Sequence, residues 1–257
     1  MHFHAKSSLL HFLLSVLILN CGCAATQIAL EKKDLKVETR MSDTIFLDIE
    51  SEPEKTVFVA LKNTSGKDID IAPYVIQKLQ QKGYVLKSSP KEAYYILQGN
   101  ILYVGVADPT ALEEVLASGP SSIISGADIG GLIGTVLEDS GKGLVYGAGI
   151  GGLAGGVADH VSGSLVKDVT YTIVADLMIS ERSEAPVEQT FETVEQKGFK
   201  DEGADVTRRI IQQSQRTSTW RKYQTRIVST ANKANLKLEE AINPLIQELS
   251  KSIAGTF

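Results

Sequence analysis

A chain of 257 residues with 43% hydrophobic and 22% charged residues has the composition of a globular protein, which excludes a disordered or fibrous chain. Its net charge of −5 and pI of about 5.5 argue against a nucleic-acid-binding protein, because such proteins carry a basic excess. We expect a folded protein with no nucleic-acid partner.

The N-terminus has the organisation of a secretory signal. Residues 1–22 contain the apolar run LLHFLLSVLIL followed by small residues, and this run is too short for a membrane span. Both cysteines of the chain lie at the expected cleavage site, where lipoprotein processing places the thiol that receives diacylglycerol. The sequence predicts lipidation, with S-diacylglycerol and N-acyl groups, at Cys23, with Cys21 as the alternative. An ordinary cleaved signal with two incidental cysteines is the other interpretation.

The residue after the lipidated cysteine would be Ala24 or Gly22. Neither is the aspartate that retains lipoproteins in the inner membrane of a Gram-negative envelope, so we expect an outer-membrane location. Residues 23–42 are then the lipidated N-terminus and a polar tether with a helical inclination over 26–42.

Residues 43–118 are predicted to form the first half of an α+β domain. Runs rich in β-branched and apolar residues predict strands, and the spacing of Ile71, Val75 and Leu79 predicts an amphipathic helix that ends at Gly83. The expected strands are Thr44–Asp48, Thr56–Leu61, Tyr84–Ser89 and Ala93–Ala107, the last one long or folded as a hairpin.

Residues 119–163 contain 14 of the 22 glycines of the chain. Two apolar arms, Ile123–Leu137 and Gly143–Ala158, flank the turn-like EDSGK, and each arm repeats glycine every fourth residue. We interpret this ladder as the packing and oligomerisation face of a helical hairpin; its members are Gly126, Gly130, Gly134, Gly143, Gly147, Gly151 and Gly155.

A membrane explains helices with so many glycines. Each glycine costs a water-exposed helix about 1 kcal/mol relative to alanine, whereas a bilayer enforces backbone hydrogen bonding, and small residues allow close helix packing. Asp128 cannot comfortably face lipid, so we expect it at another subunit, a water-filled lumen or the interface. The alternatives are a glycine-rich surface loop and, because Gly147-x-Gly149-x-x-Gly152 fits the pattern, a dinucleotide site; no convincing strand precedes that motif.

Residues 164–257 are predicted to form the second half of the domain. Strands are expected at Lys167–Arg182, at Val187–Gln196 pairing with it across a turn at Ser183–Pro186, and at Trp220–Ala231 after a polar loop. A helix over Leu238–Gly255, broken or kinked near Pro244, ends the chain. The predicted fold is therefore one α+β domain with a mixed sheet, interrupted by a glycine-zipper helical hairpin that inserts in the membrane.

The sequence indicates neither an enzyme, a metal site nor a cofactor. Three of the four histidines lie in the signal segment, which leaves His160 at the end of the second arm, more suited to an interface than to general-base catalysis. This distribution excludes a multi-histidine metal site in the mature chain. We expect covalent lipid as the sole non-protein group.

Eight basic residues and no acidic ones lie between Val206 and Leu238. Such a stretch could meet lipid phosphates, or it could be a solvated sheet edge balanced by acids from elsewhere in the fold; the second interpretation is the more common outcome for a charge run. The residues are Arg208, Arg209, Arg216, Arg221, Lys222, Arg226, Lys233 and Lys237.

Several uninterrupted blocks give a more specific indication. KYQTRIVSTANKANLKLEEA (Lys222–Ala241), SDTIFLD (Ser42–Asp48), KTVFVALKNTSGKDI (Lys55–Ile69), KDVTYTIVADLMISER and the terminal KSIA follow one another as in the TraT family of outer-membrane lipoproteins, which the mature chain closely resembles. The resemblance implies an oligomeric, lipid-anchored, surface-exposed protein that mediates surface exclusion in conjugation by hindering mating-pair formation. It also implies a contribution to complement resistance, a partner on the donor-cell surface or pilus, and no catalytic residues.

Two other classes remain open from the sequence. A ring of hairpins could serve as an envelope transport or secretion component, which would show as solute leakage that depends on the hairpin. A structural glycine-zipper lipoprotein would instead affect envelope integrity and leave conjugation unchanged.

Overall fold

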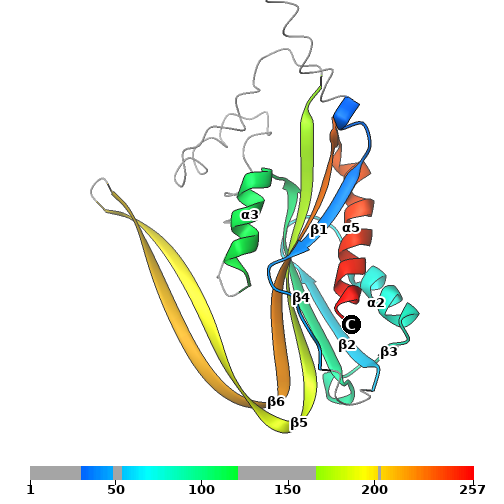
Figure 1. Ribbon diagram of the computed structural model, residues 1–257, viewed down its shortest axis with the longest axis vertical. Coiled ribbons are helices and arrows are strands. Elements are labelled where there is room, and N and C mark those ends of the chain that lie inside the picture. The colour runs from blue at the N-terminus through cyan, green and yellow to red at the C-terminus, as the bar shows by residue number, and fades with distance from the viewer. Residues whose placement is uncertain (1–29, 49–53, 121–165, 202–203) are drawn as a thin grey trace, which may run out of the picture.

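The computed structural model describes residues 30–48, 54–120, 166–201 and 204–257, with the backbone alone described for 191–201 and 204–216 (Figure 1). These residues build one six-stranded mixed sheet in the order β1-β6-β5-β4-β2-β3. The pairs β2–β3 and β2–β4 are parallel and the others are antiparallel. The strands are β1 (Lys36–Met41), β2 (Thr56–Asn63), β3 (Val85–Leu86), β4 (Tyr95–Val106), β5 (Asp168–Asp201) and β6 (Ala204–Ala234).

Helices cover both faces of this sheet. The helices are α2 (Ala72–Gln81), α3 (Pro109–Ser118) and α5 (Leu238–Gly255), with a short 3-10 turn at Pro90–Glu92. Figure 1 shows α2 and α5 on one side of the sheet and α3 on the other. Because successive side chains of a strand point to opposite faces, β5 sends Ile173 toward α5 and Val174 toward α3, and both are fully buried.

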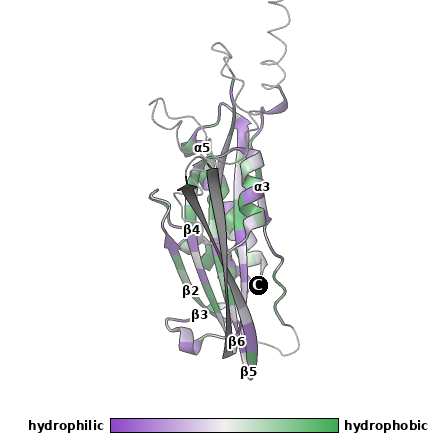
Figure 2. Ribbon diagram, turned by 90° about the vertical axis from the view of Figure 1, so that its left-hand side faces the viewer, coloured by the Kyte–Doolittle hydropathy of each residue, from purple (hydrophilic) through white to green (hydrophobic). Residues whose placement is uncertain are grey.

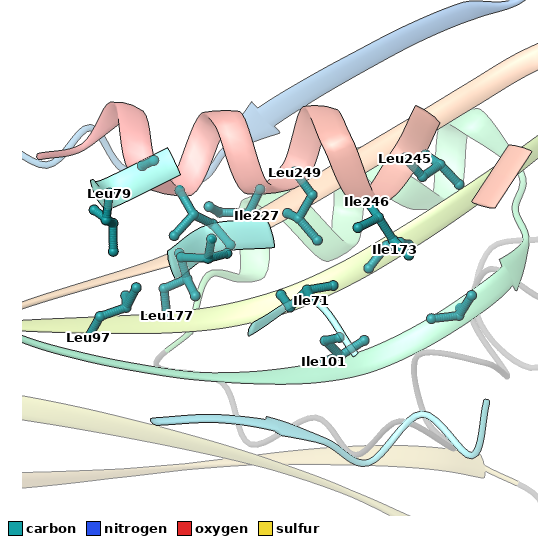
Figure 3. Packing of buried hydrophobic residues seen from close by; sticks show 14 of the residues in the cluster. Ile71, Leu79, Leu97, Ile101, Ile173, Leu177, Ile227, Leu245, Ile246 and Leu249 are labelled. Atoms are coloured by element: carbon teal, nitrogen blue, oxygen red, sulfur yellow. The ribbon is translucent and has the colours of Figure 1, made fainter. Parts of the chain in front are cut away.

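The larger core lies between the sheet and the pair α2 and α5 (Figure 3). Helix α5 buries an i, i+4 series that includes Ala241, Leu245 and Leu249, which pack over Ile173 and Ile227. Figure 2 shows hydrophobic and hydrophilic residues alternating along the helices and strands that it colours by hydropathy. The smaller core lies under α3 and contains Leu102, Leu112, Val115, Leu116, Val174 and Val228.

The two halves of the chain share this sheet, as the sequence predicts. Strand β4 from the first half pairs with β5 from the second, from Tyr95 opposite Glu181 to Val106 opposite Tyr171. The α+β class is thus confirmed. Within the part of the chain that the structure describes, no helix has the length and apolarity needed to cross a bilayer. The predicted hairpin falls on residues 121–165, outside the described residues.

Three elements follow the prediction closely. Helix α5 has the expected bounds and continues through Pro244 without a break, so the kink remains a prediction. Helix α2 buries Val75 and Leu79 on its inner face, and β4 is one long strand. The strand expected over Tyr84–Ser89 is confirmed only for the two residues of β3.

The N-terminal expectation is wrong in two places. Part of the segment expected as a helix-inclined tether is strand β1, which pairs with β6, because its alternating Val37, Thr39 and Met41 face the fold between exposed charged residues. Conversely, Thr44–Asp48 forms no strand. It runs beside β6, where the Thr225 hydroxyl bonds both the N–H and the C=O of Asp43 (3.3 and 3.0 Å) in place of a backbone ladder.

The expected hairpin across Ser183–Pro186 is also wrong. Strand β5 passes through these residues, and the register with β6 shifts between Arg182 and Val187. Proline has no N–H to donate and is tolerated at such a bulge, so Pro186 marks an irregularity within a strand and no turn. Residues beyond the bulge pair with β6 from Ser218 to Ala204, so the expected polar loop before Trp220 is strand as well.

Candidate functional site

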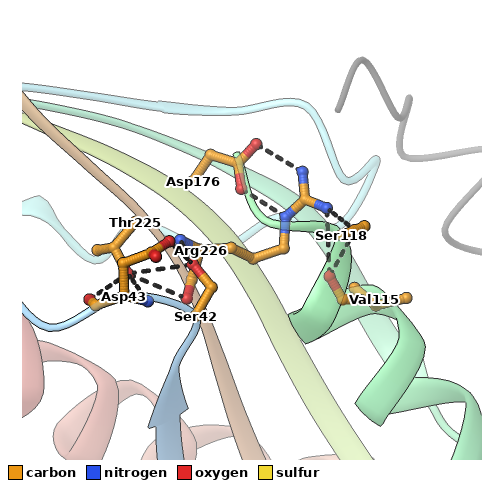
Figure 4. Close-up of polar contacts among 7 residues, drawn as sticks. All are labelled: Ser42, Asp43, Val115, Ser118, Asp176, Thr225 and Arg226. Atoms are coloured by element: carbon orange, nitrogen blue, oxygen red, sulfur yellow. Dashed lines mark hydrogen bonds and ion pairs between the residues drawn. The ribbon is translucent and has the colours of Figure 1, made fainter. Parts of the chain in front are cut away.

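A buried ion pair connects β6 to β5 in the middle of the sheet (Figure 4). The Arg226 side chain has no exposed surface, and its Nε and Nη2 donate to the two carboxylate oxygens of Asp176 at 2.7 and 2.9 Å. Asp176 is 26% exposed. This bidentate arrangement matches the planar guanidinium to the carboxylate and compensates for burial of the charge.

The other end of the guanidinium holds the C-terminus of α3. Arg226 Nη1 donates to the Ser118 Oγ at 2.8 Å and to the Val115 carbonyl at 3.4 Å. The Ser118 hydroxyl also donates to Val115 O at 2.7 Å. A cation at the last carbonyls of a helix interacts favourably with the helix dipole, so Arg226 fixes the point at which the chain leaves α3 for the glycine-rich segment.

The backbone of Arg226 is tied to the segment after β1. Ser42 N donates to Arg226 O at 2.9 Å, and Arg226 N donates to Ser42 Oγ at 3.0 Å. We call the set formed by Ser42, Asp43, Val115, Ser118, Asp176, Thr225 and Arg226 the latch. The latch joins the N-terminal segment, α3 and the two long strands at one place.

The chain re-enters the fold beside its own N-terminal segment. Lys32 Nζ lies 3.5 Å from an Asp168 carboxylate oxygen and donates to Asn232 Oδ1 at 2.8 Å, while Asn232 donates to Asp168 at 2.6 Å. Lys167 N donates to Asn235 Oδ1 at 2.9 Å. The first described residues and the residues that follow the glycine-rich segment therefore meet at the same end of the sheet.

A buried acid, Glu181, lies where the pairing of β5 with β4 ends, opposite Tyr95. Glu181 is 2% exposed; Tyr223 Oη donates to it at 3.0 Å, and Tyr95 Oη lies 3.5 Å away. Burial and the nearby Glu181 carboxylate raise the pKa of Tyr95, and burial chiefly raises the pKa of Tyr223. Both phenols are therefore neutral donors at physiological pH. Arg221 pairs with Asp48 and lies 3.8 Å from Glu181.

Beyond Glu181, β5 and β6 leave the sheet as a two-stranded ribbon, which we define as Val187–Asp201 paired with Ala204–Ser218. Arg182 braces its root: the side chain donates to Lys91 O at 2.7 Å and to Ala93 O at 3.1 Å, and its guanidinium carbon lies 4.7 Å from the Trp220 ring centroid. The ribbon therefore starts from a fixed point on the body.

Three basic residues of the stretch between Val206 and Leu238 form ion pairs with acidic residues in the described part of the chain. Arg221 pairs with Asp48 and Lys233 with Glu240, while Arg226 is in the latch. These partners come from elsewhere in the fold, as expected from the more common interpretation of a charge run. Strand β1 pairs with β6 only from Ile227 to Asn232, so the basic residues of β6 before Ile227 lie on a stretch that pairs with β5 alone among the described strands.

The lipidation and ladder residues predicted from the sequence all lie outside the described residues. These are Cys23 with its alternative Cys21, and Gly126, Gly130, Gly134, Gly143, Gly147, Gly151 and Gly155; His160 is outside as well. Among residues 30–48, 54–120, 166–201 and 204–257 there is neither a histidine nor a cysteine, and no cluster of three potential ligands could hold a metal.

Sequence reasoning missed the latch and α3. The signal for α3 was present: Asp108 before Pro109 is a helix start, and the Asp108 carboxylate accepts from the N–H groups of Thr110 and Ala111 at 2.8 and 3.1 Å. The signal for the latch was a charge in an otherwise apolar strand run, Asp176 in IVADLMI, which reveals no partner by itself.

The fold and its buried charges together define the structural class of the protein. The described residues form an α+β scaffold whose buried charges join segments of the chain to one another, and the long inserted segment and the ribbon both start from such charge clusters.

The comparisons with known proteins identify the family. Residues 34–257 match the family described as "Enterobacterial TraT complement resistance protein", and the chain belongs to this family. It is 39% identical over 246 residues to a TraT complement resistance protein of Escherichia coli, covering 94% of this chain and 93% of that protein. A protein of the same name from Escherichia coli strain K12 is 38% identical over 235 residues, covering 91% of each chain, and one from Wigglesworthia glossinidia brevipalpis is 26% identical over 237 residues.

Proposed function

We propose that the protein is an oligomeric outer-membrane lipoprotein that mediates surface exclusion in conjugation and contributes to complement resistance. The observation that carries the proposal is the family match over residues 34–257, because the family and its relatives are named for complement resistance. Surface exclusion, the lipid anchor and the oligomer come from the sequence interpretation.

The geometry of the chain ends supports attachment at one end of the domain. Lys32 and Asp168 lie side by side, the proposed lipid on Cys23 is nine residues before Lys32, and the proposed hairpin ends five residues before Asp168. An extended chain spans at most about 3.5 Å per residue, so these connections reach roughly 30 and 18 Å. These short connections support a position of both proposed membrane contacts near the same end of the sheet.

In this proposal the acyl chains and hairpins hold copies of the protein in the outer membrane through the glycine ladder. The remainder of the α+β domain projects from the attached end. It would act as a physical and recognition barrier toward a component of the donor-cell surface or pilus. The proposal requires no catalytic step.

Two substitutions separate the lipid from the ladder. We expect Cys23→Ala to abolish incorporation of labelled palmitate and to reduce both serum survival and exclusion, with Cys21→Ala as the matched control that keeps all three. Gly147→Leu combined with Gly151→Leu should keep the lipid and lose the detergent-stable oligomer. Serum survival and exclusion that are unchanged in both variants would contradict the proposal.

A further inference from the structure

Strand β3 forms an open edge of the sheet. It is the last strand in the sheet order and pairs with β2 alone among the described strands. Val85 N donates to Lys55 O at 2.7 Å, on the side of β2, and Lys87 N donates to Val57 O at 2.9 Å on the same side. Because successive N–H groups of a strand point to opposite sides, the N–H of Leu86 points away from the sheet.

The β3 edge is apolar on both faces of the sheet. Val85 and Leu86 are 56% and 41% exposed, and they are among the few large hydrophobic side chains that the described residues leave exposed. Since neighbouring side chains point to opposite faces, Leu86 lies beside buried Val57 on the face of α2, and Val85 lies on the other face. On that other face, Phe58 of β2 and Ile96 of β4 lie opposite each other, half-buried, and belong to neither of the two cores. An apolar strip therefore runs from the edge onto the sheet.

Lysines surround this apolar edge. Residues 54–55 and 82–92 together contain four lysines and two glutamates, a net charge of +2, whereas the whole chain has a net charge of −5. Among the ion pairs of the described residues, none includes Lys55, Lys87 or Lys91. The edge therefore combines apolar side chains with an excess of positive charge.

The β3 edge lies far from the end of the sheet that is proposed to attach to the membrane. Val57 of β2, beside β3, lies opposite Tyr95 of β4, which in turn lies opposite Glu181 of β5. From Asp168 at the attached end, β5 reaches Glu181 over roughly 40 Å at about 3.3 Å per residue. Figure 1 shows β3 at the margin of the sheet, at the end away from the first described residues. The proposed attachment therefore puts β3 on the projecting part of the domain.

We propose that the β3 edge binds an extended, acidic peptide segment of another protein by adding it to the sheet as a further strand. The outward N–H of Leu86 supplies a backbone hydrogen bond, while the apolar strip and the lysines select apolar and acidic side chains in alternation. Lysines on this edge also disfavour its pairing with the same edge of a second copy, because like charges would adjoin. The inference rests on the proposed function and gives the chemistry of the partner that the projecting domain recognises.

A synthetic peptide tests the edge in the full-length lipoprotein purified in detergent. The probe is a short labelled peptide in which glutamate and valine alternate. Fluorescence anisotropy measures its binding, and a benzophenone group on the probe locates the contact by cross-linking and mass spectrometry. Two control probes carry lysine in place of glutamate or N-methyl groups on alternate backbone amides, which prevent strand pairing.

Two variants of the protein separate the backbone edge from its charge. Leu86→Pro removes the outward N–H and no bond to β2, and proline is tolerated at such a position of an edge strand. The charge-reversed variant combines Lys55→Glu, Lys87→Glu and Lys91→Glu. Its matched control reverses three exposed lysines elsewhere in the fold, with Lys33→Glu, Lys36→Glu and Lys237→Glu. The melting temperature of each variant reports whether it is folded.

We expect the acidic probe to bind the wild type and to cross-link within residues 84–89. Leu86→Pro and the charge-reversed variant should each bind it about tenfold more weakly, because one loses a backbone bond and the other turns attraction into repulsion. The charge-reversed variant should instead gain affinity for the lysine probe. The matched control should bind the acidic probe as the wild type does.

Three results would overturn the inference. Equal binding of the acidic probe to Leu86→Pro and the wild type, or equal binding of the N-methylated probe, would exclude strand addition. Equal binding to the charge-reversed variant would exclude recognition of acidic side chains. Probe binding that occurs only after the protein is dissociated into single copies would assign the edge to a second copy.

The outcome for the edge is distinguishable from the outcome for the proposed function. A wild type that lowers conjugative transfer but binds no acidic probe refutes only the edge site. Probe binding by a wild type that leaves both transfer and serum survival unchanged refutes the proposed function and leaves the edge site in place.

Discussion

Removing one partner of the Arg226–Asp176 pair should be the most costly single polar substitution in the described residues. Asp176→Asn leaves the guanidinium without surface exposure and without its counter-charge. Breaking a buried pair in this way costs about 3–5 kcal/mol, and the partial exposure of Asp176 places the expected loss near the lower end. At roughly 2–4 °C per kcal/mol for a chain of this size, the melting temperature should fall by on the order of 10 °C.

The reverse deletion should cost less. Arg226→Met removes the bonds to Val115 and Ser118 but leaves an aspartate that water can reach, so we expect a loss of about 1–3 kcal/mol. Replacing both residues, with Asp176→Leu and Arg226→Met, should be less harmful than Asp176→Asn alone, because no unpaired buried charge remains.

The assay is thermal and denaturant unfolding of the purified full-length protein, analysed as a double-mutant cycle. Limited proteolysis after α3 supplies a local readout, because the latch holds the end of that helix. If Asp176→Asn lowered stability by less than about 1 kcal/mol, or the double variant were the least stable, the reasoning about the buried charge would be refuted.

Three further predictions concern other parts of the molecule. Tyr95→Phe should flatten the loss of stability at high pH: an unfolded tyrosine ionises near pH 10, and the folded pKa is higher, so the stabilisation is complete below pH 10 and declines as pH rises toward the folded value. If the melting temperature of Tyr95→Phe fell as steeply with pH between pH 8 and 11 as that of the wild type, this prediction would be refuted. Gly83→Ala should lower the free energy of unfolding by about 1 kcal/mol, because Gly83 follows the end of α2 with a φ of +86°. Chemical denaturation measures this change, and an unchanged free energy of unfolding would contradict the prediction. For Gly147→Leu with Gly151→Leu, size measurement in detergent should show loss of the large oligomer, and an unchanged size would exclude the ladder as a packing face.

The spacing of hydrophobic residues predicts correctly those elements whose pattern fits only one kind of secondary structure. The i, i+4 series of α5 and the continuous β-branched run of β4 each determine one structure, and both lie where the sequence places them. The α+β class and the shared sheet follow from these elements.

The errors arise where local pattern and tertiary context disagree. Pro186 is a turn signal in isolation, but a bulge in a long antiparallel pair tolerates it, so the sequence predicts two strands where the structure has one. The sequence places Arg226 in a run of basic residues, whereas its partners, Asp176 and the end of α3, are distant in sequence and adjoin it only in the fold. Long-range pairing of this kind leaves no spacing signature.

The central claim is that the protein excludes conjugative donors at the outer surface. The most direct measurement is the transfer frequency of the cognate conjugative element into recipients that express the protein and into recipients that lack it, with recipients that express the Cys23→Ala variant at the same total abundance as a third arm. We expect a clear drop in transfer with the wild type and a recovery of transfer with the Cys23→Ala variant. Equal transfer into both recipients, with the protein present at the outer surface, would contradict the claim.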